Sequence, residues 1–378
     1  MLHAQSRTVL LLSRRGVPLL AALVATLVPF APLGGHRERA VARVTPSVEG
    51  PLLVLGTARS GGGATLFAVA DGHAPAVLVS GLPTESAVAP SPRGRYIALA
   101  EGPRGLWLVD SDGTRRRRLL PAPRSYAPRT YALSIRAVAW SPDRYTLAYS
   151  VSQDYLGPPP KTPFVSPSLP PDSRVGLWVT RYDTPRPRQL SHLVGCGPQH
   201  CDAAIDLSWS SDGHTLGAAV YAGPGIAPYQ IDVATGRQHL LLPSGTGDPP
   251  PYVVYSPVSL RIAYLSLVSP IYNDKRTPDP GSPPEQDALL AIADTRGEHA
   301  RVVVQTPHML ASPAWSPDGR SIAYLWQRST FTTSGDDGLE LHAVDVATGR
   351  VRVWLRGPLP AAFASDDVVS LAWMHARS

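Results

Sequence analysis

The stretch AWSPDGRSIAYLW at residues 314–326 contains a tryptophan, a four-residue turn signal and an alternating apolar run. Proline presets φ at the second turn position, and aspartate can accept hydrogen bonds from the backbone of its own turn. Glycine tolerates the left-handed conformation that closes the turn. The apolar residues on either side alternate as they do in half-buried strands. The stretch therefore predicts a β-hairpin.

This hairpin is one copy of a repeat. Related copies lie at 87–102, 137–151, 207–221 and 253–267. Each copy is followed by a second hairpin with a short turn, such as LHAVDVATGRVRVWL at 341–355. The aromatic positions recur every 46 to 69 residues. A repeat of this length with four strands is typical of a β-propeller blade.

The repeat has six registers. The positions equivalent to Trp315 are Pro90, Trp140, Trp209, Tyr255, Trp315 and Trp373. The last register has only a first strand, at 369–374, and its other three strands are expected at 51–58, 65–71 and 74–80. A C-terminal strand that joins an N-terminal blade closes the ring and covers an exposed sheet edge. We therefore predict an all-β fold over residues 43–378: a six-bladed propeller of four-stranded antiparallel blades.

The WSPDG and IAY elements resemble the TolB-type β-propeller repeat, a WD40-like family, over about residues 50–377. The resemblance implies the fold but several classes of function. The repeat occurs in periplasmic scaffold proteins, in the propellers of prolyl-oligopeptidase-like enzymes and in some polysaccharide lyases. This chain departs from the pattern at Pro90, at Arg144 in place of glycine, and at Ser256–Ser259, which reads SPVS.

The N-terminal residues have the features of an export signal. Three arginines in the first 15 residues precede an uncharged, mostly apolar run at 16–35, and this order predicts that the rest of the chain is exported. Residues 1–42 are either a cleaved signal peptide or an uncleaved signal-anchor with a short linker, and the two alternatives stay open. The propeller is then extracytoplasmic, whether secreted, periplasmic or attached to the outer side of the cytoplasmic membrane through residues 16–35.

The composition is that of a loop-rich globular protein, with 41 prolines and 32 glycines. The net charge of +6 comes from arginine, because Lys161 and Lys275 are the only lysines. The densest basic run, Arg115 to Arg118, is expected to be a solvated strand edge, and no nucleic-acid partner is expected.

Two cysteines, Cys196 and Cys201, lie in HLVGCGPQHC. In an oxidising compartment such a pair predicts a disulfide that closes the loop. A metal site with His192 and His200 is the alternative, but the spacing matches no familiar zinc pattern, so no metal is predicted.

The repeat places its connections on two opposite faces. The SPDG and DVATGR turns lie on one face, which we call the short-turn face. The long connections lie on the other, the long-loop face: 121–134, 152–174, 192–204, 268–287 and 327–338. Long loops on one side of a rigid scaffold are where binding usually occurs.

The first strand of each blade should line the central channel and begin on the long-loop face. Four charged residues are therefore expected at the channel mouth, where they could bind a polar ligand or a cation: Glu85, Arg136, Asp206 and Asp367. Loop ends that simply pair with one another are the alternative. Four aromatic residues are candidate contacts on the long-loop face, with packing beneath the loops as the alternative: Tyr155, Tyr272, Trp326 and Phe331. The repeat tryptophans are expected in the core.

Sequence motifs favour a binding protein over an enzyme. The chain has no G-x-S-x-G elbow, no zincin motif and no glycine-rich phosphate loop, and we expect no cofactor. The leading hypothesis is a non-catalytic, monomeric scaffold that binds a protein or another envelope component through the long-loop face. The alternatives are a hydrolase or lyase acting on glycans or peptides at the channel mouth, and the sensor portion of a membrane-anchored protein.

Overall fold

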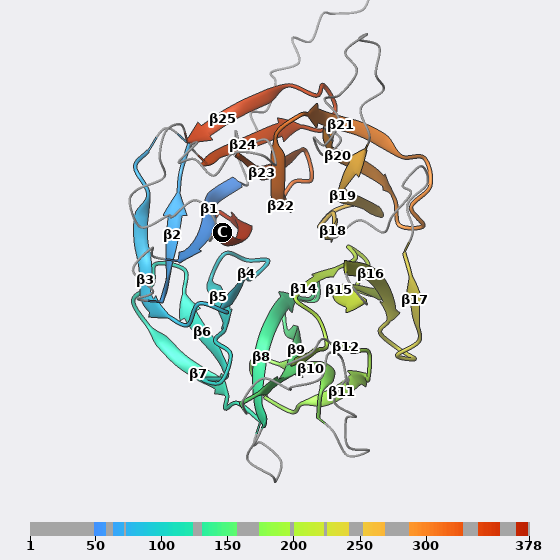
Figure 1. The fold of residues 1–378 in the computed structure, drawn as a ribbon. Helices are drawn as coiled ribbons and strands as arrows, with labels where there is room; N and C mark the ends of the chain where they lie inside the picture. Colours follow the sequence, from blue (N-terminus) through green and yellow to red (C-terminus); the bar gives the residue numbers. More distant parts are fainter. Residues whose placement is uncertain are drawn as a thin grey trace, which may run out of the picture. The chain divides into compact units, whose positions relative to one another are not determined.

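The computed structural model describes residues 49–57, 63–71, 73–123, 131–156, 174–196, 200–222, 225–241, 252–268, 287–327, 339–355 and 368–376. Its regular elements within these ranges are all β-strands, arranged as six sheets around a central axis (Figure 1). None of the described residues belongs to a helix that could cross a membrane. The predicted all-β, six-bladed propeller is confirmed.

Each blade is a four-stranded antiparallel sheet, with its strands named in order from the inner to the outer one. Blade 1 contains β26 (Val368–His375), β1 (Glu49–Thr57), β2 (Ala64–Val69) and β3 (Ala76–Leu82). Blade 2 contains β4 (Ala87–Pro90), β5 (Tyr96–Ala100), β6 (Leu106–Asp110) and β7 (Arg116–Leu120). Blade 3 contains β8 (Tyr131–Trp140), β9 (Thr146–Tyr155), β10 (Gly176–Arg181) and β11 (Arg188–Ser191).

The remaining blades follow the same order. Blade 4 contains β14 (Asp206–Trp209), β15 (Thr215–Ala222), β16 (Gly225–Asp232) and β17 (Gln238–Leu240). Blade 5 contains β18 (Tyr252–Tyr255), β19 (Arg261–Val268), β20 (Asp287–Asp294) and β21 (Arg301–Thr306). Blade 6 contains β22 (Met309–Trp315), β23 (Ser321–Gln327), β24 (Leu339–Asp345) and β25 (Val351–Leu355). Blade 3 carries an additional hairpin, β12 (Gly195–Cys196) and β13 (His200–Asp202), on the end of β9.

The ring closes as predicted. The C-terminal strand β26 pairs antiparallel with β1, with Trp373 opposite Leu52 and Ala372 opposite Leu53. Blade 1 is thus assembled from both ends of the propeller sequence, so β1 is paired on both sides instead of being an open edge.

The repeat tryptophans tie neighbouring blades together. The indole N–H of Trp140 donates to the Ala89 carbonyl at 3.0 Å, that of Trp209 to the Ala139 carbonyl at 3.3 Å, and that of Trp315 to the Val254 carbonyl at 3.1 Å. In each case the acceptor lies on the inner strand of the preceding blade. All three side chains are buried. The predicted core role of these residues is confirmed, and each also satisfies a polar group between two sheets.

Blade 5 departs from this pattern, and its neighbour compensates. Tyr255 occupies the tryptophan position, and its hydroxyl accepts a hydrogen bond from Gln230 Nε2 of blade 4 at 2.5 Å. The ring fits because residue 217 of β15 has no side chain: a Cβ there would lie 2.6 Å from Tyr255 Cε2. Gly217, Gln230 and Tyr255 therefore act as one packing unit.

This packing unit makes a testable prediction. Gly217→Ala should lower the free energy of unfolding by about 1–3 kcal/mol, because the new methyl group overlaps the Tyr255 ring. Urea denaturation followed by far-ultraviolet circular dichroism measures the loss.

The control is the same substitution in a Tyr255→Leu background. There the alanine should cost much less, because the leucine side chain ends short of the position of Cε2; the coupling between the two sites should exceed about 0.5 kcal/mol. Equal losses in both backgrounds would show that the Tyr255 ring is not the cause.

The arginine run forms part of an outer strand, as predicted. Arg116 to Arg118 lie on β7 and are exposed. Arg116 pairs with the buried Glu101, and the guanidinium groups of Arg116 and Arg118 lie 4.5 Å and 5.9 Å from the centre of the Trp107 ring. Aromatic and ionic contacts therefore hold two of these side chains along the strand edge.

Candidate functional site

The inner strands enclose a central channel with a volume of about 610 Å³. Its lining includes Glu85, Arg136 and Asp206 towards the long-loop face. Towards the short-turn face the lining instead includes the prolines of four first turns: Pro92, Pro142, Pro257 and Pro317. The channel is therefore charged at one end and mainly apolar at the other.

Two of the predicted mouth residues meet. Arg136 Nη2 lies 3.2 Å from Glu85 Oε2. Glu85 lies just before the inner strand β4 of the neighbouring blade. Arg136 also pairs with Asp154, and Ser134 Oγ donates to the other Asp154 carboxylate oxygen at 2.9 Å. The guanidinium group thus bridges two carboxylates from blades 2 and 3. Glu85 and Arg136 thus pair with each other, which is the alternative to ligand binding considered for these residues in the sequence analysis.

The local structure of β8 explains how Arg136 reaches the channel. The register between β8 and β9 shifts between Ile135 and Val138, and such a bulge re-aims the side chains beside it. Within the bulge, the Ala137 amide donates to Ser150 Oγ at 2.9 Å in place of a strand partner.

Asp154 is a site residue that sequence reasoning missed. The long loop predicted from residue 152 starts too early, because β9 continues to Tyr155 and pairs there with both β8 and β13. Residues 151–155, VSQDY, lack the alternation of apolar and polar residues that is typical of a strand, yet they form the end of β9. Its polar residues Ser152 and Gln153 are nevertheless buried, because the segment is paired with a neighbouring strand on each side.

Asp206 opens β14 and stands apart from this cluster. The Leu207 amide donates to Asp206 Oδ1 at 2.8 Å, and no ion pair involves Asp206 within the described ranges. Burial raises the pKa of the carboxyl to about 6, and the Leu207 hydrogen bond opposes this only in part. Among the described residues Asp206 therefore has no ion-pair partner, and its carboxyl group can bind a cation or exchange a proton near neutral pH.

The aromatic candidates have different outcomes. Trp326 on β23 is half-buried, stacks on His342 with ring centres 5.3 Å apart and meets the edge of His308 at 4.7 Å. It packs against the apolar cluster between blades 5 and 6, so packing is what the structure shows for this residue. Tyr155 ends β9, and its side chain lies outside the described part of the structure. Tyr272, Phe331 and Asp367 also lie outside the described residues.

The two cysteines lie on the additional hairpin of blade 3. Cys196 of β12 is directly opposite Cys201 of β13, and opposed residues in antiparallel strands have Cα atoms about 4.5–5.5 Å apart. That spacing suits a disulfide, which stays a prediction. The His192 ring, part of the metal alternative, lies 3.0 Å from Gln189 Nε2. Because β13 also pairs with β9 beside Asp154, the hairpin supports one wall of the charged mouth.

A possible metal-ligand group lies elsewhere. Asp294, Glu298 and His299 bring their ligand atoms within 4.8 Å of one another at the exposed turn between β20 and β21. The Asp294 carboxylate already accepts bonds from the Arg296 and Glu298 amides, so these contacts belong to the turn.

Comparison with known proteins agrees with the observed fold. No family model matches the sequence. The Tol-Pal system protein TolB of Acinetobacter baylyi is 37% identical over 70 residues, which cover 18% of this chain and 15% of that protein. The structure of TolB from Acinetobacter baumannii matches 86% of this chain and 66% of its own, with a TM-score of 0.53 and 17% identity. A chain of the nidogen/laminin complex matches over 87% of this chain and 100% of its own, with a TM-score of 0.52 and 8% identity.

These matches show the fold rather than a shared activity, since the structural identities are low and the chain spans less than two thirds of either TolB. Six blades, the tryptophan-anchored repeat and closure by the C-terminal strand together make this chain a TolB-like six-bladed β-propeller.

Proposed function

We propose that this chain is an extracytoplasmic, non-catalytic scaffold that binds a protein of the cell envelope through its long-loop face. The observation that carries the proposal is the asymmetry of the propeller. Its short turns are self-contained, whereas the strand ends that flank the long connections all point to the opposite face.

The strand directions support this choice of face. The first strands of blades 2 to 6 run into short turns, so their starts lie on the other side of the ring. That side also receives the end of β9 and the start of β10, which flank residues 157–173, and the corresponding ends of β19 and β20, which flank 269–286. In blade 4 the equivalent connection between β15 and β16 is only residues 223–224. The rigid core does not require the longer connections, which favours a role in recognition.

The charged mouth supports a polar partner on the same side. Glu85, Arg136 and Asp206 line the channel from three successive blades, and Asp154 pairs with Arg136. Fixed charges of both signs favour specificity over tight non-specific adhesion. One relative bears the name of the Tol-Pal system, a name that implies assembly with other proteins.

Shortening both long connections tests the proposal. Replacing 157–173 and 269–286 by two-residue links like that of blade 4 should reduce cross-linked partner recovery from an envelope fraction by about tenfold or more, since the loops supply the contact area. Quantitative mass spectrometry of the captured proteins measures the change.

The matched control alters the opposite face by Arg237→Gln and Arg350→Gln and should leave recovery unchanged. Unchanged recovery with both loops shortened, in a protein that unfolds at the wild-type temperature, would contradict binding through the long-loop face.

A propeller hydrolase or lyase is the second candidate, and Asp206 is the observation that favours it. A carboxyl group with a pKa of about 6 in a channel can serve as a general acid or base near neutral pH. A screen of glycan and peptide substrates with the wild-type and Asp206→Asn proteins separates the two candidates. Turnover by the wild type and its loss in the variant would replace the scaffold proposal.

A further inference from the structure

The short-turn face has a basic sector. It consists of the four short turns of blades 2 and 3, residues 91–95, 110–115, 141–145 and 181–187, which contain six arginines and four aspartates. The equivalent turns of blades 4 to 6 contain four arginines and six acidic residues. The turns of blades 2 and 3 therefore have an excess of two positive charges, and the turns of blades 4 to 6 have an excess of two negative charges, with histidines counted as neutral.

Three of the four aspartates of the basic sector are bound within their own turns. Asp143 accepts hydrogen bonds from the Tyr145 and Thr146 amides, both at 2.8 Å. Asp112 accepts from Thr114 Oγ1 at 2.7 Å, and Asp183 is held by Arg181 at 2.7 Å.

Four arginines of the sector form no ion pair with another described residue. Arg93, Arg115, Arg144 and Arg186 are exposed, and within the described part of the chain none of them belongs to an ion pair. These guanidinium groups can meet an external anion without first breaking an ion pair to another described residue.

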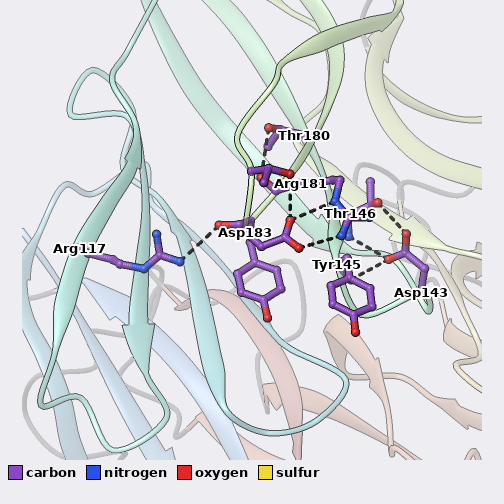
Figure 2. Close-up of polar contacts among 9 residues, drawn as sticks. Arg117, Asp143, Tyr145, Thr146, Thr180, Arg181 and Asp183 are labelled. Atoms are coloured by element: carbon purple, nitrogen blue, oxygen red, sulfur yellow. Dashed lines mark hydrogen bonds and ion pairs between the residues drawn. The ribbon is translucent and has the colours of Figure 1, made fainter.

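Aromatic side chains make the sector rigid. Tyr145 stacks on Tyr182 with ring centres 6.2 Å apart, and Tyr182 lies 5.7 Å from Tyr96 of blade 2. Figure 2 shows Arg181 between Asp183 and the Tyr145 turn, and Arg117 reaching across from β7. Arg117 Nη2 donates to the Tyr182 carbonyl at 3.3 Å. The turns of the two blades are thus fixed to each other, so their arginines form one surface.

The chain enters the propeller beside this sector. Glu49 starts β1 opposite His375, the last residue of β26, so β1 begins on the short-turn face. The first turn of blade 2 is in direct contact there, because a Cβ on Gly94 would lie 2.3 Å from the His375 carbonyl oxygen. The residues before β1 therefore join the propeller next to Arg93. They include the apolar run 16–35, and the thirteen residues 36–48 between that run and β1 can span at most about 45 Å.

We infer that the basic sector docks on the surface of a lipid bilayer that contains anionic head groups. Juxtamembrane arginines are attracted to such a surface, and tyrosine is favoured at the membrane–water interface; Tyr145 is 39% exposed between the arginines. A bilayer is favoured over an acidic protein because β1 starts on this same face and the apolar run 16–35 precedes it by only thirteen residues. The inference rests on the signal-anchor alternative, in which that run stays attached. The inference does not depend on the partner of the long-loop face, which would point away from the bilayer.

Vesicle binding of the full chain tests this inference. The probes are phosphatidylcholine vesicles with and without about one third phosphatidylglycerol, and the ratio of the two partition coefficients removes the contribution of the apolar run. A basic residue near an anionic surface strengthens binding by about fivefold. Arg93→Gln, Arg115→Gln, Arg144→Gln and Arg186→Gln together should therefore lower the ratio by at least about tenfold.

The matched control removes the same charge from the same face: Arg237→Gln, Arg296→Gln, Arg320→Gln and Arg350→Gln. It should change the ratio by less than about threefold, and both variants should keep the wild-type unfolding temperature. If the ratio fell equally in the two variants, the preference for anionic vesicles would depend on net charge alone, and the inference would be overturned. A ratio near one for the wild type would also overturn the inference. Binding of polyglutamate by such a protein would then favour an acidic protein as the partner of the sector. Salt at 1 M should abolish the preference, because it screens charges beyond about 3 Å.

Discussion

Trp315→Ala should lower the free energy of unfolding by about 3–5 kcal/mol. The indole is 7% exposed and packs in the cluster that joins blades 5 and 6. Its N–H is also the hydrogen-bond donor to the Val254 carbonyl of blade 5. Removing the side chain leaves a cavity between two sheets and an unpaired carbonyl, two effects that add to the loss. Urea denaturation at pH 7, followed by far-ultraviolet circular dichroism, measures it.

Two further variants separate the contributions. Trp315→Phe keeps most of the apolar volume and should lose roughly 1–2 kcal/mol, much of it from the missing donor. Trp178→Ala is the matched control, because the Trp178 indole N–H donates to Arg174 just upstream of its own strand and the ring is only half-buried. A Trp178→Ala loss as large as that of Trp315→Ala would refute the idea that contacts between blades distinguish the repeat tryptophans.

Asp206→Asn should stabilise the protein at neutral pH and have only a small effect at pH 4. The pKa of Asp206 is raised to about 6 in the folded state, whereas an aspartate in an unfolded chain titrates near 3.9. Between these values the folded state binds more protons than the unfolded state, so stability falls as the pH rises from about 4 to 6. Two pKa units correspond to about 3 kcal/mol, and asparagine escapes this loss because it stays neutral.

The control for Asp206 is an aspartate whose pKa moves in the opposite direction. Hydrogen bonds from Ser210 and His214 lower the pKa of Asp212 in the first turn of blade 4. Asp212→Asn should therefore reduce stability at pH 7, with its effect fading as the pH falls below the usual aspartate range. Unfolding curves from pH 4 to 8 for both variants test the two signs. An Asp206→Asn protein that is less stable than the wild type at pH 7 would show that the carboxylate has a structural partner.

The expected gain in stability on replacing Asp206 also has a consequence for function. A carboxylate that weakens the free protein is typical of a site that gains its partner only when a ligand binds. Either candidate function would use it, as a cation-binding group or as an acid–base group. The pH profile therefore reports on the channel mouth without knowledge of the ligand.

Several features of the fold were predictable from local chemistry. SPDG determines a tight turn by its own backbone preferences, and the apolar alternation on either side determines which face of each strand is buried. Counting these units predicted six blades, and the incomplete last register predicted closure by residues 369–374, as β26 and β1 confirm. The arginine run was expected at a solvated strand edge, and Arg116 to Arg118 lie exposed on β7.

The candidate site was only partly predictable. Glu85 and Arg136 could be placed at the mouth, because strand order alone brings the starts of inner strands together. Their mutual ion pair depends on a bulge in β8, and Asp154 depends on the extension of β9 by a hairpin from a distant segment. Neither feature has a local sequence signal, since pairing partners rather than side-chain preferences hold these residues extended.

The sequence by itself determined the architecture of this protein: the blade, the number of blades, the closure and the division into two faces. These follow from short-range turn chemistry and strand alternation repeated along the chain. Only the tertiary structure decided which charges meet, which tryptophan donates to which blade and which arginines have no ion pair among the described residues. These depend on distances between residues far apart in the chain, which packing sets and local preferences do not encode.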